Sequence, residues 1–176
     1  TMLSSVICPI GPGAFFRRSS YRQAGSWRTE FRQMPDYDFW LRMGLTGPIK
    51  RMPQVLANFR VHPGSQTYSV TTESRADEVI LIIDDLLASQ LAAAVPEDLA
   101  REARISAFLV SAQLHIRAGR FRVAVDRLKR AVDTRRNALI SIRTLRLLFN
   151  AMFNRISHRL LWTIRSVLKP GGGRAG

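Results

Sequence analysis

The side chain with the clearest chemical potential is the carboxylate of Asp36. It follows Pro35 and precedes the aromatic-rich stretch Tyr37–Met43. Proline is disfavoured inside a helix and aspartate caps a helix well, so the order of residues predicts a helix that begins at Asp36. A carboxylate held there has a fixed position while its oxygens can still face a cleft. Asp36 is therefore either a helix cap alone or a group that acts on a bound molecule.

The helix that positions Asp36 is predicted over about 36–46, where Gly47 and Pro48 end it. Its buried face consists of large apolar residues at helical spacing, namely Tyr37, Trp40, Leu41 and Leu45. Within the same helix, Asp38 is expected to be solvated or hydrogen-bonded locally.

Other elements are predicted on both sides of this helix. The predicted strands are 14–16, 49–52 and 55–61. The predicted helices are a brief one that Ser19 or Ser20 caps and Gly25 stops, a long one over about 70–94, a hairpin over about 98–117 and 121–134 that turns at Gly119, and a last one over about 138–168.

Length and composition fit one ordinary domain, or one small domain with an appendage. The chain has 176 residues, of which 46% are hydrophobic. No run reaches the roughly 18 apolar residues that span a bilayer, and the first residues lack the layout of a signal peptide. Cys8 is the single cysteine, which excludes an internal disulfide and a cysteine-based metal site and fits a reducing compartment.

Positive charge is concentrated in the last third of the chain. The net charge is +14, and residues 101–176 hold 17 Arg/Lys and three acids. Such a polycation favours an anionic partner: a membrane, a nucleic acid or an acidic protein. A nucleic acid is the least favoured of these, because aromatic residues are not interleaved with the basic ones in a stacking pattern.

Four segments follow one another in the first part of the chain: Gly13–Arg18, Tyr21–Gly25, Asp36–Arg42 and Leu56–Ser65. Their order and spacing resemble the second half of the catalytic domain of family-2 glycosyltransferases, over roughly residues 5–69. The resemblance implies a GT-A fold, which is α/β, and the transfer of a sugar from a nucleotide diphosphate donor to a glycan or lipid-linked acceptor. It also implies an inverting mechanism and a cytoplasmic location, either free or peripheral at the inner face of a membrane.

The resemblance implies a role for several individual residues. Asp36 corresponds to the general base that removes a proton from the acceptor hydroxyl. His62 corresponds to a ligand of Mg²⁺ or Mn²⁺, or is a loop histidine only; hard cations need several oxygen ligands besides one imidazole. The implied substrate-binding residues, each of which also has a purely structural alternative, are Gly13, Arg17, Trp27 and Arg60.

The resemblance has two departures. Pro35 stands where the family usually has a glutamate. The donor-binding half, with its nucleotide-binding unit and strand-terminal metal motif, has no counterpart in the sequence. We therefore expect the isolated chain to be inactive, and the divalent cation to require that missing half.

These patterns divide the chain into four parts. Residues 1–69 are expected to be the C-terminal part of the GT-A domain, 70–136 a helical region, 137–169 a basic amphipathic helix and 170–176 a flexible tail. The hairpin is similar to one tetratricopeptide unit in the residues Phe108, Ala112, Gly119, Phe121, Ala124, Leu128 and Ala131. The alternative is a plain antiparallel hairpin. The hairpin supports an alternative function, a non-catalytic helical module that binds a protein partner.

The last predicted helix has one apolar face and one basic face. Its apolar residues are Ile142, Leu145, Phe149, Met152, Ile156, Leu160, Ile164 and Val167, and its basic residues are Arg155, Arg159, Arg165 and Lys169. This helix either binds an anionic membrane surface or closes the helical bundle with a solvated basic side.

Overall fold

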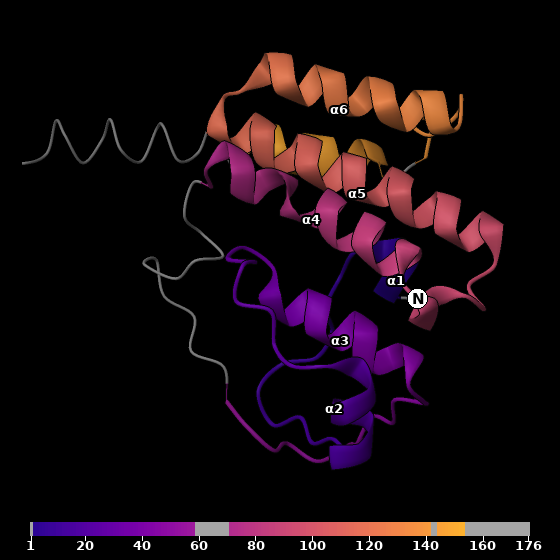
Figure 1. The fold of residues 1–176 in the computed structure, drawn as a ribbon. Helices are drawn as coiled ribbons and strands as arrows, with labels where there is room; N and C mark the ends of the chain where they lie inside the picture. The colour runs from indigo at the N-terminus through magenta and orange to yellow at the C-terminus, as the bar shows by residue number, and fades with distance from the viewer. Residues whose placement is uncertain (1, 59–70, 142–143, 154–176) are drawn as a thin grey trace, which may run out of the picture.

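The computed structural model describes residues 2–58, 71–141 and 144–153, and the regular elements in these ranges are helices. The elements are α1 (Met2–Ser5), α2 (Arg18–Ala24), α3 (Pro35–Leu45), α4 (Glu73–Ala88), the 3₁₀ turn η2 (Gln90–Ala92), α5 (Glu97–Ala118) and α6 (Phe121–Thr134). Residues 144–153 are also helical. Figure 1 shows α4, α5 and α6 stacked above the shorter helices α2 and α3.

The expected α/β architecture is wrong for the described residues. Residues 14–16, 49–52 and 55–58 form no strand, and 59–61 lie outside the described ranges. A strand needs a neighbour to pair its backbone groups, and within the described residues no backbone hydrogen bond joins these segments to one another. Phe15 and Val55 are instead largely exposed. Residues 2–58, which would belong to the GT-A half, therefore contain no sheet.

The predicted hairpin helices form as α5 and α6, whereas the helix predicted over about 70–94 ends at Ala88 as α4. On α4 the apolar residues Val79, Ile82, Ile83 and Leu86 are three or four positions apart and are all buried. They pack against α5, which lies between α4 and α6 (Figure 1). The buried cluster also takes in Leu3 and Tyr37, so residues 1–69 and 70–136 share one core.

The turn between α5 and α6 is made by Gly119. Its φ of 80° is left-handed, which glycine adopts without a steric penalty. The N–H of Gly119 donates to the Ile116 carbonyl at 3.0 Å, and the N–H of Arg120 donates to the His115 carbonyl at 2.9 Å. This pair of bonds is the Schellman motif that ends many helices. The predicted hairpin is thus confirmed, and the buried Ala112, Ala124 and Ala131 let its helices approach closely.

A carboxylate on α4 joins the two halves of the molecule. Glu78 is buried and accepts the backbone N–H groups of Arg32, Gln33 and Met34 at 2.5–3.4 Å. Three successive N–H groups form a concave anion-binding nest. The segment just before α3 is therefore held against α4, which fixes where α3 begins.

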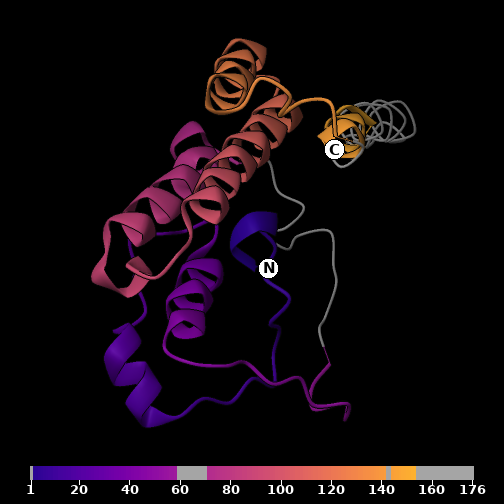
Figure 2. The same cartoon turned by 90° about the vertical axis from the view of Figure 1, so that its right-hand side faces the viewer.

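The helix over 144–153 packs beside the hairpin, as Figure 2 shows in a view turned by 90°. Its first turn is stabilised by Ser141, whose hydroxyl accepts the N–H of Thr144 at 3.1 Å. The rest of the predicted 138–168 helix lies outside the described residues, apart from 138–141, which form turns. Among the described helices, none has the length and hydropathy of a bilayer-spanning segment.

Two leucines of α4 provide a test of this core. Leu86 is 3% exposed and Leu81 is 54% exposed. We predict that Leu86→Ala lowers the free energy of unfolding by about 2–5 kcal/mol, because it leaves a cavity in the core. Leu81→Ala is the matched control and should change it by less than about 0.5 kcal/mol. Urea denaturation followed by circular dichroism measures both, and equal losses would contradict this packing.

Candidate functional site

The helix α3 begins one residue earlier than the sequence predicts, so Asp36, expected as its N-cap, is the second residue of its first turn. Pro35 is the first helical residue, because its missing N–H would have no partner in the helix anyway. Asp36 therefore follows the helix start instead of capping it. Its Oδ1 accepts the N–H of Tyr37 at 2.9 Å, and its carboxylate has no other hydrogen-bond or ion-pair partner among the described residues. The side chain is exposed and fixed at one oxygen.

A groove of about 430 Å³ opens beside this carboxylate. It is lined by parts of the first segment, α3 and α5, namely Cys8, Gln33, Met34, Pro35, Asp36, Tyr37, Val110, Leu114 and Arg117. One side thus carries a carboxylate and another a guanidinium, with apolar residues between them. Such a groove suits a polar molecule that offers a hydroxyl to Asp36.

Two further residues that line the groove, Tyr37 and Cys8, carry no activated group. Tyr37 is buried and donates its hydroxyl to the Met2 carbonyl at 3.2 Å; burial raises the pKa of this phenol. Burial also raises the pKa of the Cys8 thiol, and the nearby charge of Asp36 adds to this effect. Because a thiolate is the nucleophilic form, Cys8 is not an activated nucleophile.

Asp38 is an internal ion-pair residue. It is buried, and it accepts hydrogen bonds from Arg28 and from Arg42, whose Nη2 lies 2.7 Å from Oδ2. Burial alone would raise the pKa of the Asp38 carboxyl, but the hydrogen bonds and charges of both arginines outweigh it and hold the pKa below its usual value. The expectation of local hydrogen bonding is confirmed and that of solvation is wrong.

Arg42 uses its remaining donors on the loop after α2. Its guanidinium donates to the carbonyls of Ala24, Gly25 and Ser26, the last at 3.0 Å. The predicted end of α2 at Gly25, where φ is 82°, is thereby confirmed and anchored to α3. Arg28 continues the connection to α4 by donating to Asp85 at 3.1 Å.

Trp27, expected to stack on an acceptor, stacks on Phe39. The two ring centroids are 4.7 Å apart with an interplanar angle of 29°. Phe39 is buried and Trp27 remains partly exposed. One face of the indole is therefore used by the fold, and the exposed remainder is what a ligand could contact.

Arg17 lines a different hollow from Asp36. This hollow has a volume of about 740 Å³ and is lined by Phe15, Phe16, Arg17, Ser20, Trp40, Met43, Thr46, Gly47, Pro48, Ile49 and Lys50. None of these residues lines the groove beside Asp36. The structure thus does not bring the predicted base and this predicted substrate-binding residue to one site.

Gly13 is required by the packing of the chain itself. Its φ is 87°, and a Cβ at this position would lie 3.1 Å from the Leu56 Cβ and 3.3 Å from the Ala57 Cβ. The absence of a side chain allows the two segments to approach closely. The structure accounts for this glycine through the turn, without a ligand.

The expected metal site cannot be built from the described residues. Within 2–58, 71–141 and 144–153, no three His, Cys, Asp or Glu side chains come together in a way that could hold a cation. Arg60 and His62 lie outside the described residues. The divalent cation and the roles of these two residues stay predictions.

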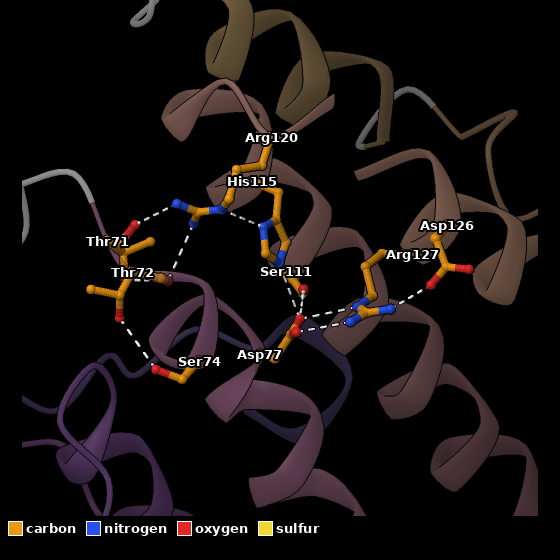
Figure 3. A network of polar contacts seen from close by, with 9 residues as sticks. All are labelled: Thr71, Thr72, Ser74, Asp77, Ser111, His115, Arg120, Asp126 and Arg127. Carbon is orange, nitrogen blue, oxygen red and sulfur yellow. Dashed lines mark hydrogen bonds and ion pairs between the residues drawn. The ribbon is translucent and has the colours of Figure 1, made fainter. Parts of the chain in front are cut away.

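A second polar cluster, which the sequence analysis did not identify, surrounds Asp77 (Figure 3). Ser111 Oγ donates to Asp77 Oδ1 at 2.5 Å, and His115 Nε2 lies 3.2 Å from the same oxygen. Arg127 binds both oxygens, through Nε at 3.0 Å and Nη2 at 2.9 Å. Ser111 and His115 are four residues apart on one face of α5, which is the one signal that could have paired them.

This cluster contains serine, histidine and aspartate but is not a nucleophilic triad. The serine hydroxyl donates to the aspartate and not to the histidine. Arg120 Nε donates to His115 Nδ1 at 2.9 Å, so the second ring nitrogen is the donor to Asp77. His115 is also fully buried. No ring nitrogen is left to accept a proton from the serine, so the cluster holds α4, α5 and α6 together.

The comparisons with known proteins add no relative. No protein-family model, no curated protein and no solved structure matches the chain.

The Asp77 cluster predicts a specific dependence of stability on pH. Burial alone would raise the pKa of Asp77, but hydrogen bonds from Arg127, Ser111 and His115 outweigh it and depress the pKa strongly. Because the folded-state pKa lies below that of the unfolded chain, the stabilisation is complete above about pH 4 and is lost as the pH falls towards the folded value.

We therefore predict that Asp77→Asn lowers the free energy of unfolding by about 2–4 kcal/mol at neutral pH, because Arg127 loses its charged partner. The difference from the unsubstituted protein should shrink below about pH 4. Asp84→Asn is the control, because Asp84 forms a loose, exposed ion pair with Arg104 at 3.7 Å. This substitution should change the free energy of unfolding by less than about 1 kcal/mol. Urea titrations at several pH values measure both, and a difference that is independent of pH would contradict the account.

Proposed function

We propose that this chain supplies the acceptor-side residues of a nucleotide-sugar-dependent glycosyltransferase in which Asp36 is the general base. The observation that carries the proposal is the state of its carboxylate. Asp36 is exposed beside a groove with one oxygen uncommitted, whereas Asp38 and Asp77 are consumed by internal hydrogen bonds and ion pairs. The reaction class, sugar transfer from a nucleotide sugar, comes from the resemblance of the segments between Gly13 and Ser65 to family-2 glycosyltransferases. A GT-A fold is no part of the proposal.

The chemistry follows from the position of the carboxylate. An acceptor hydroxyl in the groove donates a hydrogen bond to the Asp36 oxygen that the Tyr37 N–H leaves open. As the hydroxyl oxygen attacks the anomeric carbon, its proton moves to Asp36 and the nucleoside diphosphate leaves with the bonding electron pair. Arg117 in the lining adds positive charge, which favours an anionic group on the bound substrate.

The donor side of the reaction is assigned to residues outside the described ranges. These include Arg60 and His62. The Mg²⁺ or Mn²⁺ ion would bind with the donor-binding half that has no counterpart in this sequence. No step assigned to Asp36 depends on that ion. The half-buried Cys8 fits a reducing compartment, so the proposal includes a cytoplasmic location.

A second candidate is the non-catalytic module that binds a protein partner through the α5–α6 hairpin. The observation that favours it is the exposed apolar surface of α6, where Phe121 and Val125 lie one turn apart. The two candidates differ in what they require of Asp36, since a binding module has no use for its charge.

The proposal predicts the effect of Asp36→Asn in the enzyme that contains this chain together with its donor-binding residues. The amide cannot accept the proton, so the turnover number should fall by about 10²–10⁴-fold while the dissociation constant for the nucleotide sugar stays the same. Transfer of labelled sugar and calorimetric titration of the donor measure the two quantities.

Glu97→Gln is the matched control, because Glu97 is an exposed acid in the first turn of α5. It should leave both quantities unchanged. An Asp36→Asn protein that is folded and turns over at a near-normal rate would remove Asp36 from the mechanism. Absence of sugar transfer by the unsubstituted enzyme would instead favour the protein-binding module.

A further inference from the structure

The helix over 144–153 leaves most of its apolar stripe exposed. Its inward side consists of the buried Thr144 and Ala151 together with the half-buried Leu148, which packs against α5 and α6. On the adjacent side of the helix, Leu145 is 55% exposed and Phe149 is 69% exposed. Met152 extends the same stripe by one turn, since these positions are three and four residues apart. The described part of this helix therefore does not use its apolar stripe to close the bundle.

The stripe belongs to a segment whose charged residues are all basic in the sequence, although Glu102 of α5 shares a hollow with Thr144 and Leu147 of this helix. After Asp133 the sequence contains no acid, and its nine basic residues are Arg135, Arg136, Arg143, Arg146, Arg155, Arg159, Arg165, Lys169 and Arg174. Of the described ones, Arg135, Arg136 and Arg146 are exposed. In Figure 2 this helix lies at the side of the molecule, beside the α5–α6 hairpin. Apolar contact area and positive charge thus occur on the same segment.

We propose that residues 135–153 dock the protein on an anionic lipid bilayer, with Leu145, Phe149 and Met152 in the membrane–water interface. A bilayer offers both an apolar interior and negative headgroups, which matches this combination. A second copy of the chain would bring the same positive charge to the contact and would be repelled. The proposal depends on this surface and not on Asp36, so the two proposals succeed or fail separately.

Vesicle binding by the full chain tests the proposal. The protein should co-sediment with vesicles of phosphatidylcholine and phosphatidylglycerol, not with phosphatidylcholine alone, and added salt should weaken binding because it screens the charges. Leu145→Asn combined with Phe149→Asn should weaken binding by about tenfold or more, since both side chains leave an apolar environment. Arg146→Gln should weaken it by about fivefold. Leu81→Asn, at an exposed position on α4, should have no effect.

A fluorescent probe reports insertion directly. Cys8→Ser removes the one native cysteine, and Phe149→Cys then accepts an environment-sensitive NBD label. Its emission should shift to the blue on addition of anionic vesicles, whereas the same label at Leu81→Cys should not respond. Circular dichroism checks that each variant is folded.

Four results would overturn the proposal. They are equal binding to neutral and anionic vesicles, unchanged binding by the Leu145/Phe149 double variant, an unshifted label at position 149, and a dimer in solution that the double variant converts to a monomer. The last result would make this face a contact between copies of the chain.

Discussion

Two adjacent carboxylates on α4 organise this molecule. Asp77 reaches towards α5 and α6, where Ser111, His115 and Arg127 engage it, and Glu78 reaches towards the backbone N–H groups just before α3. A buried carboxylate is costly unless hydrogen-bond donors surround it, so each acid dictates where its partners must lie. Together they fix the hairpin on one side of α4 and the start of α3, with Asp36, on the other. The candidate groove is therefore a consequence of how α4 is held.

Arginine has two distinct uses in this chain. Arg28, Arg42, Arg120 and Arg127 are structural, because each donates to carboxylates, carbonyls or a ring nitrogen of the fold. Their planar, multiple donors suit this role better than lysine would. Arg135, Arg136 and Arg146 are exposed, lie in a segment without acids and form no ion pair with the described residues. The basic residues that lie far from any acid in the sequence are thus concentrated in the last segment.

Two different hollows lie beside α3. The groove at Asp36 combines a carboxylate with Arg117, whereas the hollow at Arg17 combines aromatic rings with Arg17 and Lys50. The two are lined from opposite ends of α3, because Asp36 is in its first turn and Met43 in its last. The first hollow therefore offers a carboxylate and the second offers aromatic rings and cations.

The sequence by itself determined most of the helices, though not α1 or the end of α4. Periodic apolar residues on α3 and α4, and Gly25 and Gly119 as stops, placed these elements within a few residues, because helical hydrogen bonds are local. Tertiary structure alone decided the remainder. The expected strands at 14–16 and 49–52 had no neighbour to pair with. The states of Asp38 and Asp77 depended on Arg28 and Arg127, which are 10 and 50 residues away in the sequence. A strand and a carboxylate are both defined by their partners, and those partners are brought together only by folding.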